Sequence, residues 1–123
     1  MVENDFMTEE LATAKRLVDL LEQDGYSLES AVWVVDEEGS GRLYLVPRKR
    51  VASDLQETIR VAYTISAHKE ELPARHDLRY SIVEPENPII QAIRSATRRG
   101  GKVRGIFKDG TYIDTAYVLR PAA

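Results

Sequence analysis

The run Ala31-Val32-Trp33-Val34-Val35 constrains the fold of this 123-residue chain more than any other segment. β-branched and aromatic residues favour strands, and five apolar residues are too few for a helix. Because none of the five is polar, we expect a strand that is central in its sheet or covered on both faces. A polar segment, residues 36–41, and a second apolar run, residues 43–47, follow it. Together they predict a β-hairpin that ends at Pro47, which cannot donate a ladder hydrogen bond.

Three helices are predicted from apolar spacing and end signals. The first covers residues 8–24, with Thr8 as its cap and Gly25 just past its end. The second starts at a capping box formed by Ser53 and Gln56 and fades before Pro73. The third starts at Asn87-Pro88 and stops at the glycine pair that follows its basic end. In the second helix, the spacing places four residues on one stripe: Leu55, Ile59, Ala62 and Ser66.

Three further strands complete the prediction. Residues 78–83 alternate between apolar and polar side chains, and residues 102–107 and 111–119 flank an Asp109-Gly110 turn. The resulting order is αββαβαββ, which lacks the regular alternation of a doubly wound fold. We therefore expect an α+β fold: a single-layer mixed five-stranded sheet with three helices, in which both hairpins are antiparallel and crossovers make other strands parallel. The length and the lack of a composition break predict one domain, residues 1–123.

Composition and the first residues predict a soluble, cytoplasmic protein. The chain has no cysteine, which excludes disulfides, thiolate metal sites and cysteine nucleophiles and is compatible with a reducing compartment. The N-terminus is acidic where a secretory signal would be basic and then apolar, and no later segment approaches a membrane-spanning run.

Charge is unevenly distributed along the sequence, and this gives the main functional lead. Residues 1–41 contain eleven acidic and two basic residues, a balance of −9, whereas residues 42–123 contain nine acidic and fifteen basic residues, a balance of +6. Phosphate binding requires clustered cations of this kind. The predicted anion- or nucleic-acid-binding residues are Arg48, Lys49, Arg50, Arg94, Arg98, Arg99, Lys102 and Arg104. The alternative is structural, since cations favour the last turns of a helix and alternate outward on strands.

Several segments together resemble a group of small stand-alone bacterial proteins of uncharacterised function. The segments are Trp33, residues 42–47, residues 85–89 and residues 110–120, and they span most of the chain. The resemblance implies a fold shared with that group and carries no activity with it.

A catalytic site has weaker support in the sequence. A metal-dependent nuclease brings two acids and a lysine around a divalent ion, whereas Arg48 and Lys49 follow their strand without an acid. Glu84 and Asp114 are the acids at or in predicted strands. The turn at residues 36–41 lacks the spaced ligands of a calcium loop, and the glycine pair is too short for a phosphate loop. We therefore expect no cofactor and no metal.

The two histidines offer a second catalytic reading. His68, followed by Lys69-Glu70-Glu71, together with Asp77, has the composition of a base with orienting carboxylates. His68, however, falls near a predicted helix end and His76 in a linker. Surface or capping roles are the prediction for both.

Taken together, the residues favour a non-enzymatic binding or interaction module with a basic patch for an anionic partner, either nucleic acid or an acidic protein surface. The alternative is a nucleic-acid-processing enzyme of the metal-dependent, nuclease-like type. Protein association is a further hypothesis, because we expect the long last strand to lie at a sheet edge, where its free backbone groups pair with a second copy in a homo-oligomer or with an extended peptide.

Overall fold

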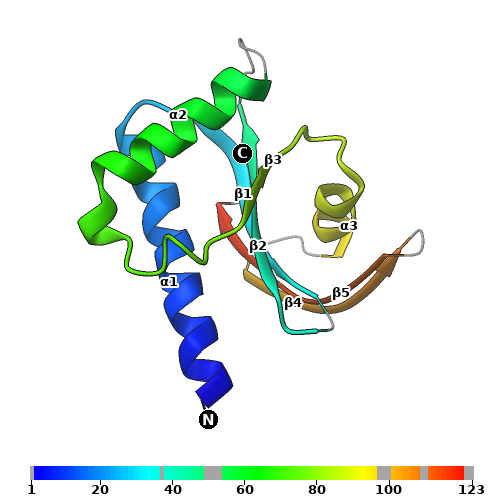
Figure 1. Ribbon diagram of the computed structural model, residues 1–123. Coiled ribbons are helices and arrows are strands. Elements are labelled where there is room, and N and C mark those ends of the chain that lie inside the picture. The colour runs from blue at the N-terminus through cyan, green and yellow to red at the C-terminus, as the bar shows by residue number, and fades with distance from the viewer. Residues whose placement is uncertain (1, 37, 49–53, 97–100, 109–110, 121–123) are drawn as a thin grey trace.

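The computed structural model describes residues 2–36, 38–48, 54–96, 101–108 and 111–120, and within these the side chains of residues 9–36, 38–48, 55–95, 105, 113 and 115–119. The helices and strands follow one another along the chain as coloured in Figure 1. Their bounds are α1 (Val2–Gln23), β1 (Leu28–Val35), β2 (Gly41–Pro47), α2 (Asp54–Ala67), the single 3₁₀ turn η1 (Lys69–Glu71), β3 (Tyr80–Ile82), α3 (Pro88–Ala96), β4 (Gly101–Lys108) and β5 (Thr111–Arg120).

The described strands form one mixed sheet in the order β3-β2-β1-β5-β4. β1 is antiparallel to β2 and to β5, β4 is antiparallel to β5, and the short β3 lies parallel to β2. The predicted α+β class is confirmed. The prediction that the last strand lies at a sheet edge is wrong, because the final hairpin returns β5 against β1. The edges of the described sheet are β3 and β4.

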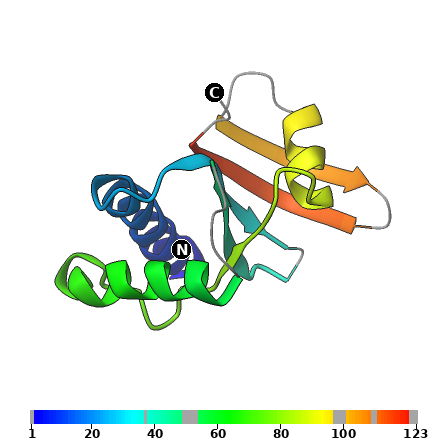
Figure 2. The ribbon, with the colours of Figure 1, turned by 90° about the horizontal axis from the view of Figure 1, so that it is seen from above.

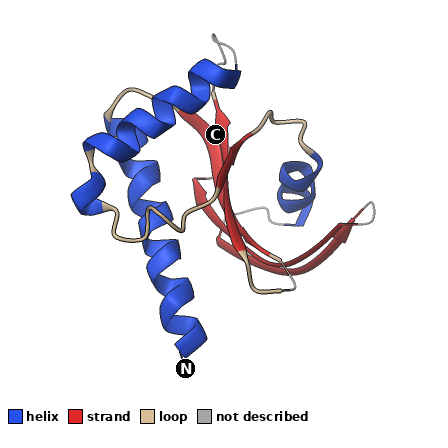
Figure 3. Ribbon diagram, in the orientation of Figure 1, coloured by secondary structure: helices blue, strands red, loops and turns tan. Residues whose placement is uncertain are grey.

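Helices cover both faces of the sheet. α1 and α2 lie on one face and α3 lies on the other, as the two ribbon views and the helix–strand colouring show (Figures 1, 2 and 3). The apolar side chains of β1 accordingly divide between two cores, with Trp33 in the core under α1 and α2, and Val32 and Val34 in the core under α3. Both interpretations of the apolar run hold, since β1 is central and is covered on both faces. No helix among the described residues is long and apolar enough to span a membrane.

The helix ends follow the sequence signals in part. α1 ends at a Schellman motif, in which Gly25 has φ +88° and Tyr26 N–H donates to the Leu21 carbonyl at 2.8 Å. Asn87 caps α3, since its Oδ1 accepts from Ile89 N–H at 2.9 Å. α1, however, begins at Val2, so Thr8 lies within the helix and does not cap its start. The capping box at Ser53 lies outside the described residues.

The buried face of α2 differs from the apolar stripe predicted from the sequence. Leu55 is 69% exposed and Ile59 is 56% exposed, whereas Glu57, Val61 and Thr64 are buried. Polar side chains turn inward here because they have partners there: Tyr26 donates to Glu57, and Thr64 donates to Asp24. Hydrogen bonding offsets the desolvation cost of their burial, and the apolar stripe is left facing solvent.

Candidate functional site

Two of the eight predicted basic residues have described side chains, and both contact the start of β1. Arg48 donates from Nε to Ser27 Oγ at 3.1 Å and from Nη2 to the Leu28 carbonyl at 3.4 Å. Arg94 pairs with Glu29, with Nη2 and Oε1 3.0 Å apart. The acceptors of Arg48 carry no formal charge, whereas Arg94 is neutralised by a carboxylate. Arg94 therefore has a structural role, which is to hold the end of α3 against β1.

The strand register puts the end of β2 and the start of β4, which adjoin the remaining basic segments in sequence, at the same end of the sheet. Leu28 pairs with Pro47, Ala31 with Arg120, and Val118 with Gly101, so β1 and β4 begin where β2 and β5 end. Figure 2 shows the start of β4 beside the end of β5. We call this the basic end of the sheet. Three strand spacings separate β2 from β4, about 14 Å in all.

The other six predicted residues are placed less completely. Lys102 and Arg104 lie two positions apart in the edge strand β4, with only their backbone described. Lys49, Arg50, Arg98 and Arg99 lie outside the described residues. That the cations form one continuous patch therefore stays a prediction.

A cleft of about 510 Å³ opens on another part of the molecule, between α2 and the turn that follows α1. Tyr26 forms its floor and is buried, with the guanidinium carbon of Arg60 5.1 Å from the ring centroid. Behind the ring, Tyr26 Oη donates to the buried Glu57 carboxylate at 2.5 Å. The residues that line the cleft are Asp24, Tyr26, Ile59, Arg60, Tyr63, Thr64, Ala67 and His68.

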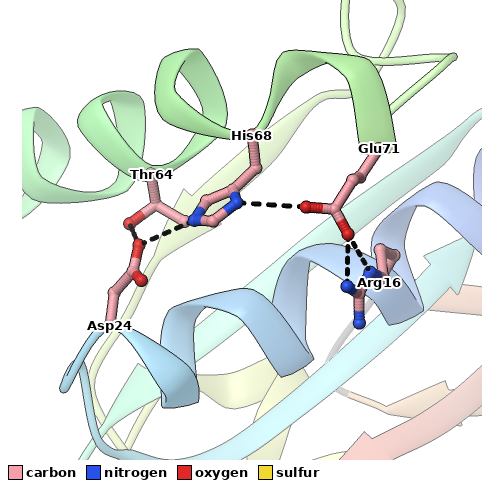
Figure 4. Close-up of polar contacts among 5 residues, drawn as sticks. All are labelled: Arg16, Asp24, Thr64, His68 and Glu71. Carbon is pink, nitrogen blue, oxygen red and sulfur yellow. Dashed lines mark hydrogen bonds and ion pairs between the residues drawn. The ribbon is translucent and has the colours of Figure 1, made fainter.

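His68 stands at one end of this cleft in a cluster of polar side chains (Figure 4). Its Nε2 lies 3.4 Å from Asp24 Oδ2 and its Nδ1 lies 3.2 Å from Glu71 Oε2. Thr64 Oγ1 donates to the same Asp24 oxygen at 3.0 Å, and Arg16 pairs with Glu71. The hydrogen bond from Arg16, followed by that from His68, lowers the pKa of the Glu71 carboxyl.

The role of this cluster is structural. Each polar group in it is engaged by another member, and together they connect α1 to α2 and η1. The Thr64 hydroxyl donates to a carboxylate and not to the imidazole, so it is not placed for His68 to activate as a nucleophile. The structure thus favours the surface role predicted for His68. The sequence signal missed Asp24 and Arg16, because both lie more than forty residues away along the chain.

Asp77, the other carboxylate considered beside His68, acts instead on Glu10 of α1. Burial raises the pKa of Glu10 above its ordinary value, the negative charge of Asp77 raises it further, and Arg79 offsets part of the effect. The folded protein therefore binds a proton at Glu10 more readily than the unfolded chain does. It follows that stability falls as the pH rises through the window from the ordinary value of 4.5 to the raised one.

Replacing Glu10 with glutamine is therefore expected to increase the free energy of unfolding at pH 7. The neutral amide is not ionised, so it removes the cost of holding a buried carboxylate near Asp77. Well below pH 4.5 the gain should disappear, because Glu10 is then protonated in both states. Urea unfolding at both pH values measures this, with Glu86→Gln at an exposed position before α3 as the matched control. An equal gain from both variants would contradict the assignment to Glu10.

Metal-binding geometry is absent from the part of the molecule that the structure describes. Within those residues, no group of three or more histidines or carboxylates is placed to hold an ion. Glu84 is exposed after β3, and the Asp114 side chain lies outside the described set. In the acidic turn, Asp36 Oδ1 accepts from its own loop, from Glu38 N–H and Ser40 N–H at 2.9 Å each. The Asp36 carboxylate therefore stabilises its own turn.

Comparison of the chain with protein-family models, with curated proteins and with solved structures found no match in any of the three. What the protein does is therefore inferred from its own residues and their geometry.

Proposed function

We propose that this protein is a non-enzymatic binding module that holds an anionic partner, a nucleic acid, at the basic end of the sheet. The observation that carries the proposal is the strand register, which puts the end of β2 and the start of β4 at one end of the sheet. Both segments are basic: residues 48–50 are all cationic, and residues 98–108 contain five cations and no acid.

The distance between the two segments fits a polyanion better than a small anion. The two segments are separated by about 14 Å, and duplex DNA carries about one negative charge for every 1.7 Å of its axis, so several phosphates fit between them. A small anion would contact only one segment. The anchored positions of Arg48 and Arg94 further support the proposal, because these residues tie the flanking segments to Ser27, Leu28 and Glu29 at the start of β1.

Salt dependence tests the proposal. Fluorescence anisotropy with a labelled mixed-sequence DNA oligonucleotide should show binding that weakens linearly in log–log form as the salt concentration rises. The double variant Arg98→Ala, Arg99→Ala should flatten the slope by roughly 1 for each phosphate that it no longer neutralises. Polyglutamate, tested in parallel, separates nucleic-acid recognition from binding to any acidic polymer.

The matched control is the double variant Lys15→Ala, Lys69→Ala. It removes the same two positive charges from exposed positions in α1 and η1, away from the basic end of the sheet. If both double variants change the slope equally, or if the wild-type protein binds no oligonucleotide at low salt, the proposal is wrong. Equal affinity for polyglutamate would instead identify an acidic protein surface as the partner.

A further inference from the structure

A small polar pocket of about 170 Å³ opens beside the turn that joins β1 to β2. It lies at the end of the sheet opposite the basic end, because β1 starts at the basic end and finishes here, at Val35. Its volume is below that of pockets that enclose drug-sized ligands, so it admits one small group. The residues that line it include Val34, Asp36, Ser40, Arg42, Tyr44 and Arg79.

Two arginines from neighbouring strands bring positive charge to this pocket. Arg42 lies in β2, and Arg79 comes directly before β3, where its carbonyl accepts a hydrogen bond from Leu43 N–H at 2.8 Å. Among the residues that the structure describes, neither guanidinium has a carboxylate within ion-pair distance, and Arg79 acts on Glu10 of α1 only from farther away. The charge of both arginines is therefore available to a ligand.

Neutral acceptors hold Arg42 in place. Its Nη1 donates to Ser81 Oγ at 3.0 Å and to the Tyr80 carbonyl at 3.4 Å. A guanidinium has five N–H donors, so the donors on Nη2 and Nε remain after these two bonds. Because the side chain is already held in one orientation, a ligand that binds the remaining donors does not have to order it.

The other polar groups of the pocket also favour an anion. Burial raises the pKa of the Tyr44 phenol, and the positive charge of Arg42 offsets part of this rise. Tyr44 therefore keeps its proton at neutral pH and serves as a hydrogen-bond donor. The acid in the lining, Asp36, has its Oδ1 occupied by two N–H groups of its own turn. Two guanidiniums against one carboxylate leave the pocket positive.

We propose that this pocket binds a phosphate group. Paired N–H donors of arginine match the oxygens of phosphate and of carboxylate. A carboxylate has two oxygens and is satisfied by one guanidinium, whereas a tetrahedral phosphate accepts from both arginines and from Tyr44 at once. The site lies at the opposite end of the sheet from the proposed nucleic-acid surface and does not depend on it.

Titration with inorganic phosphate, followed by heteronuclear NMR at constant ionic strength, tests the proposal. We expect saturable shifts at the Nε–H signals of Arg42 and Arg79. Arg79→Gln should weaken phosphate binding about tenfold or more, and because Arg79 is exposed, the fold should stay intact. Tyr44→Phe keeps the aromatic ring and removes one donor, so it should weaken binding by a smaller factor. Arg60→Gln removes the same charge from an exposed position on α2 and should leave binding unchanged.

Acetate and glycerol phosphate, titrated in the same way, define the group that is bound. Tighter binding of glycerol phosphate than of inorganic phosphate would support the proposal and identify a phosphate ester as the ligand, and the reverse order would support free phosphate. Equal affinity for acetate, shifts that stay linear in phosphate concentration, or equal losses in Arg79→Gln and Arg60→Gln would overturn it. The Arg98→Ala, Arg99→Ala variant should bind phosphate here as the wild-type protein does, so this test and that of the proposed function fail separately.

Discussion

Gly41→Ala is expected to destabilise the protein by about 3 kcal/mol, the upper part of the range for overpacking a core. Gly41 opens β2, and a Cβ placed there would lie 2.1 Å from Cζ2 of Trp33, far inside van der Waals contact. Trp33 is fully buried in the core under α1 and α2, so its ring has no free space into which to retreat. Urea unfolding of the variant measures the loss.

A double-mutant cycle assigns this loss to the ring. Trp33→Leu destabilises the protein by itself, but it removes the aromatic atoms that the new Cβ would meet, so Gly41→Ala should cost much less in that background. Gly39→Ala is the control. Gly39 has φ +86° and open space around it, so its cost comes from the backbone and should be the same with either residue at position 33. Additive effects of Trp33→Leu and Gly41→Ala would show that the clash is not the cause.

The class and the centre of the fold were predictable from sequence because their signals are local. Because residues 31–35 are all apolar, both faces of β1 favour burial, and its central place between β2 and β5 agrees with that. The caps at Gly25 and Asn87 are equally local, since each acts within its own turn. The position of β5 was not predictable in this way. A strand's place in a sheet depends on which strand its hairpin meets, and the residues of the hairpin do not specify that.

The orientation of α2 departs from its sequence pattern for a different physical reason. Hydrophobic periodicity assumes that polar residues face water, but Glu57 and Thr64 have partners inside, on Tyr26 and Asp24. Those partners lie in the turn after α1, at least thirty residues earlier. Only the fold brings them close. For the same reason, the sequence identified His68 as a candidate but could not supply Asp24 as its neighbour.

The basic end of the sheet was predictable from the sequence only in part. Its residues were identified from composition, whereas the placement of the end of β2 and the start of β4 at one end of the sheet depends on strand pairing, which only the register supplies. Arg94 shows that a count of basic residues in the sequence can overestimate the positive charge available on a surface. It belongs to the basic run in sequence, yet in the fold its charge is opposed by Glu29 on β1.

Tyr26→Phe is expected to cost about 1.5–3 kcal/mol of stability, the range for a hydrogen bond to a charged group. The two partners are almost completely inaccessible, with Tyr26 4% and Glu57 2% exposed, and they join the turn after α1 to the buried face of α2. Without the hydroxyl, Glu57 keeps its desolvation cost and loses this donor. Urea unfolding measures the difference, and Tyr63→Phe, a hydroxyl deletion on the exposed face of α2, should cost little.

Replacing both partners with apolar groups should recover much of that loss. In the double variant Tyr26→Phe, Glu57→Leu, no carboxylate is left buried without its donor, and a leucine of similar size fills the space between the ring and α2. The double variant should therefore be more stable than Tyr26→Phe alone, although it carries one substitution more. If it is less stable, the hydrogen bond from Tyr26 does not offset the cost of burying Glu57. The burial of the polar face of α2 then has another cause.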